Sequence, residues 1–119
     1  MKKVAKLIFV AYTLFIIVMA VIPSAPVTTG SDKLNHWLAF FLWAILLRYS
    51  FKESYWGIFF YSVFFGAFIE ILQYFLPYRT AEYGDFVADI FGALCGMFIY
   101  FAYEFGVNIL KEHGEEGEL

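Results

Sequence analysis

The sequence has one cysteine, three prolines and no run of basic residues. The single cysteine, Cys95, cannot form an intrachain disulfide, so a disulfide-stapled scaffold is excluded. The net charge at pH 7 is only -3, and without a basic run this argues against a nucleic-acid partner. Linker-like and low-complexity segments are also missing, so the 119 residues are expected to form a single domain.

Apolar residues, in contrast, are abundant. They make up 62% of the sequence, and aromatic residues alone make up 24%, whereas a soluble domain is about 45–50% apolar. A chain this short buries a small share of its surface on folding, so it could not hide this much apolar surface in its own core. The composition therefore predicts a protein whose solvent is lipid.

The apolar residues fall into four blocks, each near the roughly 20 residues that a helix needs to cross a bilayer. The blocks cover about residues 4–22, 34–49, 55–76 and 86–105. An open sheet could not leave its backbone edges in lipid. We therefore predict an all-α integral membrane protein, with four transmembrane helices in one compact bundle and a short cytoplasmic tail at 106–119. The first block is longer than the core of a signal peptide, which predicts an uncleaved helix.

The distribution of basic residues predicts the orientation. Four spans place both termini on the same side of the membrane. Six basic residues lie on that side: Lys2, Lys3, Lys6, Arg48, Lys52 and Lys111. The opposite side carries two, Lys33 and Arg79. Because cytoplasmic segments are enriched in Lys and Arg, we expect a multi-pass protein of the cell membrane with cytoplasmic termini.

Polar residues gather at the extracytoplasmic side of this topology. They are Asp32, Lys33, Asn35, His36, Glu70, Gln73, Arg79, Glu82, Asp85 and Asp89. Ionisable residues inside a membrane are costly and are usually paired or functional. We expect Arg79 to act as the countercharge of Glu70, Asp85 or Asp89, and the alternative is that the whole set only joins the helices.

The polar residues of each helix form a stripe along one helix face, and small residues continue this stripe into the membrane. Positions three, four and seven apart share one helix face, so Gly66 lies in line with Glu70, and Gly92 and Gly96 lie in line with Asp85. Small residues allow helices to approach closely. We predict that these glycines are packing residues, and that the polar stripes face each other across the bundle.

Two segments resemble the signatures of VanZ-like membrane proteins. Residues 31–36, Ser-Asp-Lys-Leu-Asn-His, are similar to the Asp-Lys-x-x-His signature of that family. Residues 70–73, Glu-Ile-Leu-Gln, then Arg79, Asp85 and Gly92, are similar to its second signature, and the likeness covers about residues 4–105. Asp89 stands where the family usually has Asn, which adds a titratable group.

The resemblance implies a bacterial cell-membrane protein, and the family's namesake is associated with resistance to the glycopeptide antibiotic teicoplanin. Our first hypothesis is an outer-leaflet site that binds a cell-envelope lipid head group, a cell-wall precursor or a lipophilic glycopeptide. The candidate ligand-binding residues are Asp32, Lys33, His36, Glu70, Gln73, Arg79, Asp85 and Asp89. Membrane lipids are the expected partners, and the oligomeric state is left open.

The main alternative is an enzyme that acts on a lipid-linked phosphate or a cell-wall precursor. Glu70, Asp85 and His36 would then be catalytic, as an acid and base or as ligands of a metal. No cofactor motif is evident, but a divalent cation fits: Mg, Mn or Ca on carboxylates, or Zn with His36. Established metal and nucleophile motifs are missing. A third hypothesis, a proton-coupled transporter, finds no inverted repeat to support it.

Overall fold

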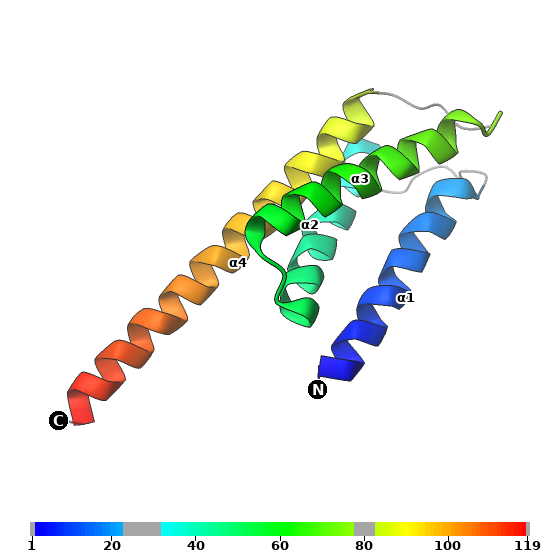
Figure 1. The fold of residues 1–119 in the computed structure, drawn as a ribbon. Helices are drawn as coiled ribbons and strands as arrows, with labels where there is room; N and C mark the ends of the chain where they lie inside the picture. Colours follow the sequence, from blue (N-terminus) through cyan, green and yellow to red (C-terminus); the bar gives the residue numbers. More distant parts are fainter. Residues whose placement is uncertain (1, 23–31, 78–82, 119) are drawn as a thin grey trace.

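The described chain consists of four helices and no strand. The computed structural model describes residues 2–22, 32–77 and 83–118, apart from the side chains of residues 2, 32 and 114–118. The helices are α1 (Lys2–Val21), α2 (Asp32–Phe51), α3 (Tyr55–Tyr74) and α4 (Tyr83–Glu118). The all-α prediction and the prediction of four helices are confirmed (Figure 1).

Three of the helices are long and apolar enough to cross a membrane. They are the segments Lys3–Val21, Tyr55–Tyr74 and Tyr83–His113, and only 17%, 22% and 22% of their residues are buried. Soluble proteins do not expose apolar surface on this scale, which makes this chain a membrane protein. The second helix falls short of the same criterion because Asn35, His36 and Arg48 lie within it.

The last helix extends well beyond the boundary expected from hydropathy. We placed its end near residue 105 and a tail after it, but α4 continues to Glu118. The reason lies in the local sequence, because Ile109, Leu110, Lys111 and Glu112 tolerate or favour helix and no proline follows Pro77. Figure 1 shows this part of α4 projecting alone, away from the other helices.

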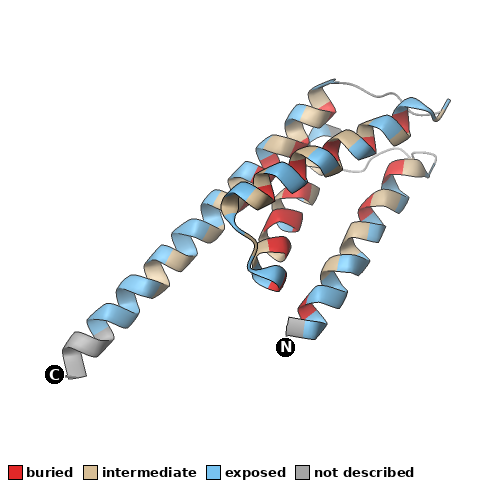
Figure 2. Ribbon diagram, in the orientation of Figure 1, coloured by how far each residue is buried: buried red, intermediate tan, exposed pale blue. Residues whose placement is uncertain are grey.

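The buried core is centred on α2. Its residues Phe40, Trp43, Ala44 and Leu47 are 1–7% exposed. The rings of Phe40 and Trp43 stack on Phe65 of α3, with centroids 5.3 and 5.0 Å apart. The red segments of Figure 2 show that the buried residues of the other helices turn toward this centre.

Two glycines set the close approach of α4 to α2. A Cβ atom on Gly92 would lie 2.9 Å from the carbonyl carbon of Trp37 and closer still to its oxygen. A Cβ on Gly96 would lie 3.2 Å from the carbonyl carbon of Phe41. Both glycines are buried, so the helix backbones touch here without intervening side chains. A Cβ on Gly66 would meet the ring of Phe86 at 3.3 Å.

Side-chain hydrogen bonds attach α1 to the bundle. The Tyr12 hydroxyl donates to the Ala39 carbonyl at 3.0 Å, and Trp43 Nε1 donates to Thr13 Oγ1 at 3.0 Å. These two contacts fix α1 against α2. Because water is scarce at these depths, each bond also satisfies a group that would otherwise be costly in lipid.

Candidate functional site

Polar side chains from three helices meet at one end of the bundle. The N-terminal turns of α2 and α4 and the C-terminal part of α3 lie together there (Figure 1). Residues 36 and 89 are 53 positions apart in the chain, yet their side chains are in contact. The prediction that the polar stripes of these helices face each other is therefore confirmed for α2 and α4. The fold creates a polar cluster that no single segment contains.

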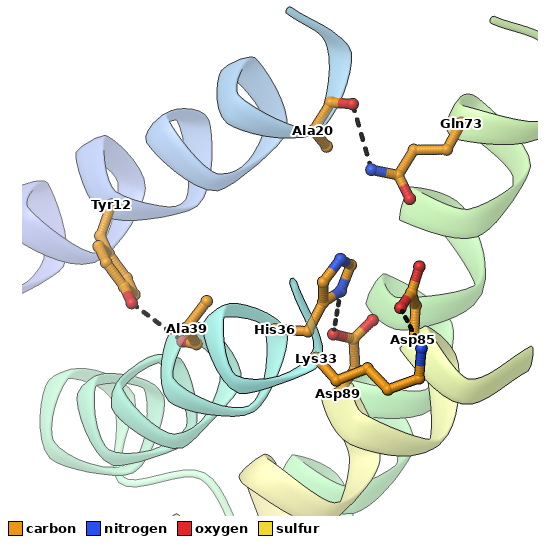
Figure 3. Close-up of polar contacts among 8 residues, drawn as sticks. All are labelled: Tyr12, Ala20, Lys33, His36, Ala39, Gln73, Asp85 and Asp89. Carbon is orange, nitrogen blue, oxygen red and sulfur yellow. Dashed lines mark hydrogen bonds and ion pairs between the residues drawn. The ribbon is translucent and has the colours of Figure 1, made fainter. Parts of the chain in front are cut away.

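His36 and Asp89 form the centre of this cluster. The Nδ1 atom of His36 lies 2.7 Å from Oδ1 of Asp89, and the dashed line between them in Figure 3 marks this contact. Asp89 is completely buried, and the His36 side chain is 12% exposed. A buried carboxylate is costly unless it is paired or accepts hydrogen bonds. The imidazole N–H therefore stabilises Asp89, and Asp89 fixes the orientation of the ring.

Glu70 of α3 completes a group of three potential ligands. One ligand atom each from His36, Glu70 and Asp89 lies within 4.8 Å of the other two. With metal–ligand bonds of about 2.0–2.2 Å, neighbouring ligands of a tetrahedral ion are about 3.4 Å apart. An inward shift of the side chains would therefore be needed to bring the three groups around one cation.

Lys33 and Asp85 lie one helical turn closer to the end of the bundle. Lys33 Nζ is 3.7 Å from Asp85 Oδ1, and the lysine side chain is 52% exposed while that of Asp85 is 4% exposed. Figure 3 places this pair beside Asp89. The half-exposed Lys33 therefore places a positive charge between the solvent and the buried carboxylates.

Gln73 has a structural contact on the opposite side. Its side chain is 3% exposed, and its Nε2 donates to the Ala20 carbonyl at 3.2 Å. In Figure 3 its amide nitrogen points to the Ala20 carbonyl of α1. This bond joins α1 to α3, so a role as a helix bridge accounts for Gln73. Among the other predicted site residues, Arg79, Glu82 and the side chain of Asp32 lie outside the described residues.

The described cluster contains more hydrogen-bond acceptors than donors. Three carboxylates, from Glu70, Asp85 and Asp89, face one ammonium group and one imidazole. Carboxylates accept hydrogen bonds and bind cations, and imidazole donates, accepts or binds a metal. The arrangement can therefore hold a divalent cation, or a ligand that donates hydrogen bonds through hydroxyl or ammonium groups.

A second polar group, which the sequence analysis did not foresee, lies at the other end of α2. Nε and Nη2 of Arg48 donate to the two carboxylate oxygens of Glu104, each at 3.0 Å. Nη1 donates to the carbonyl of Glu53 at 2.8 Å, and the Tyr55 hydroxyl also hydrogen-bonds to Glu104. In the sequence, Arg48 enters only the count of basic residues that predicts the orientation, and no prediction concerns Glu104. Nothing in their spacing, 56 positions, links them.

Comparisons with known proteins place the chain in a family. Comparison with curated proteins and with solved structures gave no match. The family model for VanZ/LLP1 matches residues 9–105 of the 119. The matched region includes α2 and α3 whole and the residues of the polar cluster. The chain therefore belongs to the VanZ/LLP1 family.

Proposed function

We propose that this protein binds, at its polar cluster, the head group of a cell-envelope lipid or of a lipophilic glycopeptide, and so modulates envelope function or teicoplanin resistance. The observation that carries the proposal is the convergence of His36, Glu70 and Asp89 from three different helices to within 4.8 Å. Helix packing alone gives little reason to bury such groups, because polar contacts between membrane helices contribute only about 0.6 kcal/mol on average.

The chemistry of the cluster favours a ligand that offers hydroxyl or ammonium groups. The carboxylates of Glu70, Asp85 and Asp89 supply acceptors, and Lys33 supplies a partly exposed cation for an anionic part of the same ligand. A lipophilic molecule could keep its apolar part in the bilayer, against the exposed rings of the helices, while its polar part enters the cluster. Family membership and the excess of basic residues at the other end support an extracytoplasmic location for it.

A resistance assay tests the proposal in cells. The wild-type protein and His36→Ala are expressed in a teicoplanin-sensitive bacterial host, and the minimal inhibitory concentration of teicoplanin is measured. We expect the wild-type protein to raise it and His36→Ala to abolish the increase. Gly106→Ala serves as the matched control, because a Cβ at Gly106 meets nothing within 4 Å.

A binding assay tests the same site without a cellular readout. Purified protein in nanodiscs is titrated with teicoplanin, and the heat of binding is recorded for the wild-type protein, His36→Ala and Gly106→Ala. Binding by the wild-type protein and the control, with loss in His36→Ala, supports the proposal. Equal binding by all three would place the ligand elsewhere on the protein and reject the assignment of the cluster.

The second candidate function is a metal-dependent enzyme acting on a lipid-linked phosphate. The observation in its favour is that His36, Glu70 and Asp89 fit the ligand set of one divalent cation. Such an ion would polarise a phosphoryl oxygen or activate water. Titration of the purified protein with Mn²⁺ or Zn²⁺ tests this function directly. Binding of one equivalent that Glu70→Gln abolishes would favour the enzyme, and no binding at millimolar metal would reject it.

A further inference from the structure

An apolar groove lies at the end of the bundle opposite to the polar cluster. It is formed by α1, the C-terminal half of α2 and the middle of α3, and has a volume of about 470 Å³. Trp43 and Leu47, which are buried, form its floor, and the rings of Phe9, Phe51 and Phe64 form its sides. A volume of this size lies within the range of about 300–1000 Å³ that is typical of ligand pockets.

The groove exists because α1 and α3 touch at one end only. The hydrogen bond from Gln73 to the Ala20 carbonyl holds them together near the polar cluster. From that point the two helices diverge toward the N-terminal end of α1, as Figure 1 shows. The residues of α2 line the bottom of the space between these two helices, and the space opens at the side of the bundle.

Basic residues lie close to Phe51, at one end of the groove lining. Lys6 Nζ lies 5.3 Å from the centroid of the Phe51 ring, which lines the groove. Lys52 follows Phe51 directly and is exposed, and Lys3 is exposed one turn before Lys6. Glu53 is the acidic residue of the lining. The groove is therefore apolar along its length and carries a net positive charge at its entrance.

We propose that this groove binds one acyl chain of an anionic glycerophospholipid, with its phosphate at Lys6 and Lys52. Basic pockets between membrane helices are known sites for anionic head groups. A helix about 10 Å wide displaces about 80 Å³ per Å of its length, so the groove would hold only about one helical turn. The groove would therefore take in little of a helix from a second copy, whereas an acyl chain is thin enough to enter it.

The groove and the polar cluster are separate sites. The groove lining begins at Trp43 and continues toward Phe51 on α2, whereas the cluster begins at His36 near the other end of that helix. The lipid proposal therefore does not rest on the function proposed for the cluster, and failure of one leaves the other intact.

Tryptophan fluorescence offers a direct test, because bromine atoms on an acyl chain quench a nearby indole. Trp43 lies in the groove floor, and Trp37→Phe with Trp56→Phe leaves it as the single tryptophan. This variant is placed in phosphatidylcholine nanodiscs that contain a minor fraction of brominated phosphatidylglycerol or of brominated phosphatidylcholine. We expect quenching by the brominated phosphatidylglycerol to exceed that by the brominated phosphatidylcholine by about fivefold. This is the factor by which one basic residue near an anionic surface strengthens binding.

Two further variants complete the test. Adding Lys6→Gln and Lys52→Gln should make the two brominated lipids quench Trp43 equally. A control variant keeps only Trp56, which is 75% exposed. Both brominated lipids should quench it equally, with or without the two lysines, because Trp56 contacts bulk lipid. Equal quenching of Trp43 by both lipids in the protein that retains both lysines would overturn the proposal. The absence of quenching by either lipid would also overturn it, because the groove would then be closed to acyl chains.

Discussion

His36 Nδ1 and Asp89 Oδ1 lie 2.7 Å apart and join the first turns of α2 to the first turns of α4. Asp89 has no exposed surface, so the imidazole is part of the environment that makes its burial tolerable. This contact also orients the imidazole toward Glu70, and the three groups form the candidate site.

The first prediction separates the hydrogen bond of Asp89 from its charge. Asp89→Asn keeps an oxygen that accepts from His36, so its thermal midpoint in detergent should stay close to that of the wild-type protein. Asp89→Ala removes the acceptor from a buried donor, which costs about 1–3 kcal/mol, and should lower the midpoint clearly. If Asp89→Asn destabilises the protein as much as Asp89→Ala does, the negative charge is what matters at this position.

The second prediction concerns the contact between the backbones of α2 and α4. Gly92→Ala should destabilise the bundle by about 1–3 kcal/mol, the usual cost of overpacking, because its Cβ would meet the Trp37 carbonyl. Gly106→Ala is the matched control, with open space around it, and should stabilise its helix by up to about 1 kcal/mol. Thermal unfolding in detergent measures both variants. A neutral Gly92→Ala would show that α2 and α4 are further apart.

The third prediction concerns the cluster that the sequence analysis missed. Arg48 and Glu104 share two hydrogen bonds of 3.0 Å, and both side chains are partly exposed, at 22% and 34%. A double-mutant cycle with Arg48→Ala and Glu104→Ala should give a coupling energy of about 0.2–1 kcal/mol. Arg48→Lys should lose part of this coupling because an ammonium cannot make the paired contact. Additive effects of the two alanine variants would mean that the pair contributes nothing.

The fourth prediction concerns the orientation of the chain in the membrane. A membrane-impermeant maleimide applied to intact cells should label Tyr83→Cys and spare Glu112→Cys, both in a Cys95→Ser background. Tyr83 is 93% exposed at the polar end of the bundle, and Glu112 is exposed at the other end of α4. Permeabilised cells provide the control, because both positions should then react. The reverse pattern in intact cells would invert the proposed topology.

The helices and the polar end of the bundle were predictable because they follow from local patterns. Block length and the spacing of Glu70, Asp85 and Asp89 place the carboxylates on inward faces near one end, and the structure has Asp85 and Asp89 buried there. The spacing of Gly92 and Gly96 likewise predicted a close helix contact, which the backbone of α2 supplies. Each of these inferences needs information from one helix at a time.

Pairings between helices were not predictable in the same way. The partner of His36 depends on the rotation of α4 against α2, and that rotation is set by the packing of Gly92 and Gly96 of α4 on the α2 backbone. The partner of Arg48, Glu104, lies inside the predicted block 86–105, but which face of α4 meets Arg48 depends on the same packing of α4 against α2. Apolar content alone marked the end of the membrane segment, whereas helix formation continued into the polar residues that follow.

The second helix has a further consequence for how this protein is made. Its polar residues at both ends, His36 and Arg48, meet carboxylates of α4 that are translated 53 and 56 residues later. During synthesis α2 therefore leaves the ribosome before the groups that neutralise its ends exist. Until α4 arrives, α2 has α1 as a neighbour through Tyr12 and Thr13, and α3 as a neighbour through Phe65. Assembly of the polar contacts of α2 is thus completed by the last helix, which supplies the partners of His36 and Arg48.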